Sequence, residues 1–173
     1  MNRSIAMLLA AAMMLFAGIA GVAAQMQAFS SAEGRLAIQL PGRPQYIPTD
    51  VPVAGGGTIK LHQYAVEVGD SLAFIASYAD YPDSMVAGAR GDEVLRRVQT
   101  ASVGQRKLVA DGITDIDGNA GRYYVAEGAD GLVLQARIYL VGNRLYQNIV
   151  VSDVRSRSAP EIRQFFDSFR LLK

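Results

Sequence analysis

The chain has 173 residues, half of them apolar, and a formal net charge of +1. It contains no cysteine, which excludes disulfides, zinc–thiolate sites, thiol nucleophiles and the lipid-modified cysteine of a bacterial lipoprotein. The near-neutral charge, without a basic run, argues against nucleic acid or an anionic membrane as the main partner.

The first 24 residues have the pattern of a cleaved secretory signal. Arg3 precedes an apolar run over residues 5–20, and Val22-Ala23-Ala24 supply small residues of the kind a signal peptidase needs. The run is too short for a typical spanning helix, so an uncleaved anchor is the weaker alternative.

Cleavage before Gln25 predicts an exported protein, periplasmic or secreted, with no stable membrane insertion. Because Arg3 is the only charged residue of the signal, the mature chain carries as many basic as acidic residues. We expect a flexible start over residues 25–33 and a single domain over residues 34–173.

In the first half of the domain, apolar and polar residues alternate with the period of a β-strand. Strands are predicted at residues 34–40, 46–53, 58–68 and 72–78. Pro48 and Pro52 confine the second of these strands to a sheet edge. Over residues 84–103 the period becomes helical, and its glycines favour a clean helix start only near Asp92.

The second half begins with two predicted hairpins. The first joins residues 108–116 to residues 122–127, and the second spans residues 131–153 around Gly142-Asn143. This pair suits a two-residue turn, which sets Tyr139 opposite Tyr146.

The two faces of the second hairpin differ in polarity. One face is apolar and carries Leu132, Leu134, Ala136, Ile138, Leu140, Leu145, Ile149 and Val151. The other carries Arg137, Tyr139, Tyr146 and Asn148, the candidate binding residues, because interfaces favour tyrosine and arginine. Tyr123 or Tyr124 of the preceding hairpin is a candidate to join them. The alternative is that a helix covers this face and the tyrosines reach solvent only at their tips.

Residues 158–173 predict a closing helix in which Ile162, Phe165, Phe166 and Phe169 share one face. Ser158 and Glu161 form a capping-box pattern at its start. Phe166 and Phe169 are expected to dock on the apolar hairpin face, against Leu134, Ile138 and Ile149. The elements together predict an α+β fold, with a central antiparallel sheet of six to seven strands and helices packed on its faces.

Residues that could carry chemistry are few and isolated. His62 is the only histidine, and no orienting carboxylate or nucleophile can be read beside it. Asp115-Ile116-Asp117-Gly118-Asn119 has part of a calcium-loop pattern but lacks acidic residues at both ends, which favours a hairpin turn. Gly55-Gly56-Gly57 lacks the Lys-Ser/Thr pair of a phosphate loop, which favours a flexible connection. No catalytic residue, metal site or cofactor is predicted.

Three segments recur in this order in one known group: LAIQLPGRP at residues 36–44, YLVGNRLY at residues 139–146 and FFDSF at residues 165–169. Through them the chain resembles the superfamily of the extrinsic photosystem II subunit P (PsbP), the Ran-binding Mog-type proteins and the bacterial DcrB-like proteins, and within it an exported bacterial branch. The resemblance implies an α/β/α sandwich built on an antiparallel sheet. The metal-binding histidines of photosynthetic members have no counterpart, because His62 stands alone.

Three function classes remain. A non-catalytic binding or assembly module of the cell envelope, acting on an envelope protein through a sheet-surface or loop patch, is favoured because it needs only a rigid sheet and a surface patch. A carrier of a small apolar ligand would need a cavity between the sheet and a helix. A carboxylate-based hydrolase would need a pocket with a perturbed carboxylate pair, for example around Asp80 or Asp83.

Overall fold

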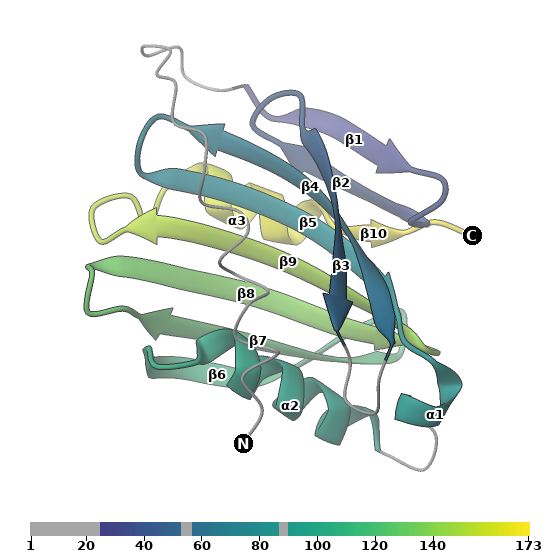
Figure 1. The fold of residues 1–173 in the computed structure, drawn as a ribbon. Helices are drawn as coiled ribbons and strands as arrows, with labels where there is room; N and C mark the ends of the chain where they lie inside the picture. Colours follow the sequence, from purple (N-terminus) through teal and green to yellow (C-terminus); the bar gives the residue numbers. More distant parts are fainter. Residues whose placement is uncertain (1–24, 53–56, 87–89) are drawn as a thin grey trace.

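The computed structural model describes residues 25–52, 57–86 and 90–173. The predicted signal and most of the triple-glycine loop lie outside these ranges. The described elements, shown in Figure 1, are β1 (Gln27–Ser31), β2 (Leu36–Leu40), β3 (Gln45–Pro52), β4 (Thr58–Val68), β5 (Leu72–Asp80), α1 (Asp83–Val86), α2 (Gly91–Val103), β6 (Lys107–Ile116), β7 (Asn119–Glu127), β8 (Leu132–Val141), β9 (Arg144–Asp153), α3 (Pro160–Ser168) and β10 (Arg170–Leu171).

Seven strands form the main sheet, in the order β3-β4-β5-β9-β8-β7-β6, and every neighbouring pair is antiparallel. The predicted α+β class is therefore confirmed. β3 lies at one edge, as its prolines require, since a proline cannot donate to a second neighbour. β6 forms the opposite edge.

A smaller sheet of β1, β2 and β10 corrects the prediction of a flexible start over residues 25–33. β1 pairs with β2 along its whole length, from Gln27 opposite Leu40 to Ser31 opposite Leu36. The Phe29 ring lies 4.6 Å from the Tyr64 ring of β4. This contact and the pairing with β2 hold β1 in place, although its short sequence shows no clear alternation of apolar and polar residues.

The central hairpin has the predicted register. Tyr139 pairs with Tyr146, and Val141 pairs with Arg144 across the turn. Gly142 has φ 61°, a left-handed conformation that suits the first position of a type II′ turn. The two-residue turn therefore fixes which side chains share each face of β8 and β9.

The two main helices cover opposite faces of the sheet (Figure 1). α2 packs on the apolar hairpin face, where Leu95 and Val103 join Leu134, Ile138 and Ile149 in one buried cluster. The prediction that the closing helix docks on this face is wrong. α2 covers this face with its own apolar side, on which Val94, Leu95 and Val103 are buried.

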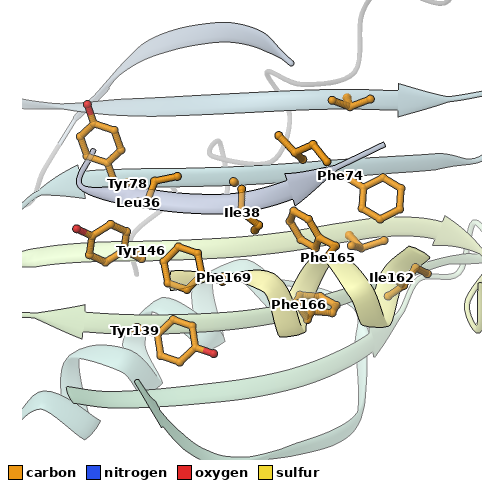
Figure 2. Packing of buried hydrophobic residues seen from close by; sticks show 14 residues of the cluster. Leu36, Ile38, Phe74, Tyr78, Tyr139, Tyr146, Ile162, Phe165, Phe166 and Phe169 are labelled. Atoms are coloured by element: carbon orange, nitrogen blue, oxygen red, sulfur yellow. The ribbon is translucent and has the colours of Figure 1, made fainter. Parts of the chain in front are cut away.

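The closing helix instead packs on the tyrosine face. Figure 2 shows Phe169 beside Tyr139 and Tyr146, and the ring centroids are 5.6 Å apart in both pairs. Phe165 lies edge-on to Phe74 of β5, with the centroids 5.3 Å apart. Tyrosine rings offer large apolar area, so this face is as suitable a core surface as the aliphatic one.

α3 is shorter than predicted. It begins at Pro160 with Ala159 as N-cap and no side-chain cap bond, so the capping box at Ser158 and Glu161 is not formed. Proline suits this first helical position because its missing N–H would have no partner there. The chain after Phe169 is extended and adds β10 to β2.

The predicted helix over residues 84–103 is divided into a short α1 and a longer α2 that starts at Gly91, close to the expected Asp92. Within the described ranges, no helix has the length and apolarity needed to cross a membrane.

Candidate binding surface

The four candidate residues on the central hairpin are not an exposed patch. Tyr139, Tyr146 and Asn148 are only 4%, 2% and 1% exposed beneath α3. Arg137 alone reaches solvent, where its guanidinium forms an ion pair of 2.9 Å with Asp167. The closing helix occupies this surface, so the alternative of cover by a helix is the correct one and the expectation of a sheet-surface patch at these residues is corrected.

His62 lies in an aromatic stack on the same face of the sheet. Its ring is parallel to that of Tyr78, with the centroids 4.4 Å apart, and its Nδ1 lies 2.7 Å from the Tyr46 hydroxyl. The Tyr78 hydroxyl is buried, and burial raises the pKa of this phenol. The stack places no nucleophile with a lowered pKa next to His62.

Asp80, considered above for a hydrolase, is held by Arg144. The guanidinium donates from Nε and from one terminal nitrogen to the two carboxylate oxygens, each at 2.6 Å. These hydrogen bonds lower the pKa of Asp80. A general acid requires the opposite shift, so the pairing with Arg144 argues against that role for Asp80. Arg144 also donates to the carbonyl of Glu33, which ties the β1–β2 turn to the main sheet.

A different surface is exposed at the β6 edge. Of the seven exposed large hydrophobic side chains in the described chain, four lie on β6 and β7: Leu108, Val109, Ile113 and Tyr123. Ile113 is 79% exposed. We call these four residues and the hollows beside them the β6–β7 surface. Tyr123 lies on the face of Gly112 and Ile113 on the face of Arg122, so exposed apolar side chains line both faces of this open edge.

Two hollows continue this surface toward α3. One has a volume of about 400 Å³, and its lining includes Tyr123, Arg137 and Phe166. The other, of about 330 Å³, extends to Arg157 after β9. Both are lined by Val125 and Gln135, so they adjoin, and we call the two together the groove along β7 and β8. Aromatic and arginine side chains are typical of protein-binding surfaces.

A polar network holds this edge of the sheet on α2. Arg122 of β7 donates to Gln99 of α2 at 2.6 Å and to Asp111 of β6 at 2.7 Å. Gln99 also donates to Asp111, and this bond, followed by the contact with Arg122, lowers the pKa of the carboxyl. The network therefore ties β6 and β7 to α2 at this edge of the sheet.

The partial calcium pattern at residues 115–119 is a hairpin turn, as predicted. Asp117 and Gly118 both have positive φ, 49° and 76°, which is the type I′ geometry. The Asn119 amide donates to the carbonyls of Ile116 and Asp117. In the described ranges, no group of three or more His, Asp or Glu side chains is arranged to hold a metal ion.

This fold is similar to that of a solved protein, although the sequence has no match. No protein-family model matches the sequence, and no curated protein matches it. Among solved structures it is similar to cyanobacterial PsbP (CyanoP) from Synechocystis sp. PCC 6803, with 16% identity, a TM-score of 0.56, and coverage of 90% of this chain and 97% of that one. A weaker similarity, to the putative regulator PA94 of unknown function from Pseudomonas aeruginosa, has 14% identity, a TM-score of 0.39, and coverage of 75% of this chain and 84% of that one. The chain therefore has a PsbP-like fold.

Proposed function

We propose that the protein is a non-catalytic, exported binding module of the cell envelope and that it docks a partner protein on the β6–β7 surface. The observation that carries the proposal is the concentration of exposed apolar side chains on these two strands. Export is supported by the signal pattern before Gln25.

The chemistry of the surface fits a protein partner. Tyr123 supplies an aromatic ring that is 43% exposed on one face of the sheet edge, and Ile113 supplies an exposed aliphatic side chain on the other face. Arg137 and Arg157 flank the groove, and each is paired with a carboxylate near the surface. Apolar centres with a polar rim of this kind are the usual anatomy of interfaces.

The layer between sheet and helix argues against the small-ligand carrier. Phe74, Phe165 and Phe169 are each at most 2% exposed and pack against one another or against tyrosines in this layer (Figure 2). An apolar ligand would have to displace these rings. The ion pair with Arg144 lowers the pKa of Asp80 and so disfavours this carboxylate as the general acid of a hydrolase.

Site-specific photo-crosslinking in intact cells tests the proposal. A photoreactive phenylalanine at position 123 is expected to give one discrete adduct, recovered in the envelope fraction with a protein that begins at Gln25. The matched control is position 46, because Tyr46 is also exposed, at 46%, but lies on the opposite edge strand.

Competition distinguishes docking from chance contact. Excess unlabelled protein should abolish the adduct, whereas excess Ile113→Lys variant should not, since a charge replaces the exposed apolar side chain without touching the core. Equal adducts at positions 46 and 123, or none at position 123, would refute the proposal.

A further inference from the structure

The β6 edge has regular backbone geometry over seven residues. After an irregularity between Leu108 and Ala110, β6 pairs with β7 without interruption from Ala110 to Ile116. The turn closes with Ile116 opposite Asn119, which is the hydrogen-bonded pair of a two-residue hairpin. Hydrogen-bonded and non-bonded pairs alternate along an antiparallel ladder. The backbone N–H and C=O of Asp111, Ile113 and Asp115 therefore point outward, away from β7.

The side chains of these three residues share one face. Asp111 contacts Gln99 of α2, and alternation along the strand places Ile113 and Asp115 on the same side. All three side chains are exposed. Asp115 makes no ion pair within the described part of the chain, and Asp117 in the turn adds a further carboxylate nearby. The open edge thus has an acidic–apolar–acidic pattern at alternate positions.

The opposite face of the strand offers an aromatic contact. The Tyr123 ring lies over Gly112 so closely that a Cβ built on this glycine would be 2.5 Å from it. Gly112 adds no side chain of its own, so the ring extends along the open edge. A chain lying beside β6 would meet this ring on one face and Ile113 on the other.

We infer that β6 accepts an extended segment of the partner as an additional strand, and that this segment carries basic, apolar and basic side chains at alternate positions. This inference rests on the proposed function and specifies its chemistry. Main-chain hydrogen bonds to Asp111, Ile113 and Asp115 provide the pairing. Lysine or arginine opposite Asp111 and Asp115, with an apolar residue opposite Ile113, provides the specificity, because opposite charges facing each other across strands are favourable.

A second copy of this chain fits the edge less well. Pairing β6 with its copy about Ile113 brings apolar against apolar but sets Asp111 of each chain opposite Asp115 of the other. Like charges directly opposite each other destabilise a strand pair. The partner is therefore a different, basic segment.

Binding of synthetic peptides to the chain starting at Gln25 tests the inference. The probe is a fluorescein-labelled peptide with Lys, Val and Lys at alternate positions separated by threonines, measured by fluorescence anisotropy. N-methylation of the Lys and Val amides, which would pair with β6, should weaken binding about tenfold or more. N-methylation of the threonine amides, which would point away, is the matched control and should leave binding within about twofold.

Charge reversal supplies the second arm. Replacing both peptide lysines by glutamate should weaken binding to the parent, and Asp115→Lys should shift the preference toward the glutamate peptide by about two- to fivefold. Asp70→Lys, on an exposed turn of the same sheet, should change nothing.

Equal binding of the two methylated peptides, equal effects of Asp115→Lys and Asp70→Lys, or no binding of the lysine peptide would overturn the inference. A persistent adduct at position 123 would then show that docking itself remains and only strand addition is wrong.

Discussion

Phe165 provides the most direct test of how α3 holds the fold. Its side chain is fully buried, and its ring lies 5.3 Å from those of both Phe74 and Phe166. A buried phenylalanine removes about 150–250 Å² from water, which at about 25 cal/mol per Å² corresponds to about 4–6 kcal/mol. Alanine keeps part of that area, and the lost ring leaves a cavity. Phe165→Ala should therefore lower the free energy of unfolding by about 3–5 kcal/mol.

Urea unfolding followed by circular dichroism measures this loss as a lower midpoint at an unchanged slope. A domain of this kind has about 5–15 kcal/mol in total, so Phe165→Leu serves as a milder second variant in case the alanine variant does not fold. Val154→Ala, at a side chain that is 53% exposed, is the control. If Phe165→Ala and Val154→Ala lose the same small free energy, α3 does not hold the sheet in the way described.

Two further predictions concern backbone space and pH. Gly121→Ala should lower the free energy of unfolding by about 1–3 kcal/mol, because the new Cβ would lie 2.5 Å from the buried Tyr139 ring. Gly112→Ala is the control, since its Cβ would meet only the exposed Tyr123 ring, which can move. Thermal unfolding compares the two variants, and equal losses of stability would contradict the reasoning. Arg144 lowers the pKa of Asp80, so the contribution of this pair is present above pH about 4 and is lost as the pH falls through the lowered pKa. Because Asp80 is half exposed, Asp80→Asn should cost about 1 kcal/mol or less at neutral pH and nothing in strong acid, and a pH-independent difference between parent and variant in urea unfolding would refute this.

The sequence predicts the strands better than it predicts which helix packs on each face of the sheet. The register of β8 and β9 follows from a two-residue turn at Gly142-Asn143, which is a local property. Which helix covers which face is not local. Both faces of the hairpin offer enough apolar area, and the hydroxyls of Tyr139 and Tyr146 suggested exposure although their rings are core.

The β6–β7 surface, which we propose as the binding site, is predicted from the sequence only at Tyr123, for a related reason. Ile113 and Tyr123 lie in ordinary alternating strands, and nothing in their own residues shows that no element covers them. Their exposure follows from the order of strands, which places β6 at an edge, and for Tyr123, on the α3 face, also from the short length of α3. The usable sequence signal is the pair Asp111 and Asp115 around Ile113, since charges are typical of edge strands.

The small sheet has a consequence for the order of folding. Its middle strand, β2, pairs with β1 just before it and with β10 near the end of the chain, where Leu171 lies opposite Leu36. The second pairing must close a very long loop, and pairings between such distant segments form slowly. Until residues 170–171 have paired, β2 lacks one neighbour and the chain after α3 lacks its final anchor. We expect the tyrosine core beneath α3 to close late in folding, whichever compartment the chain folds in.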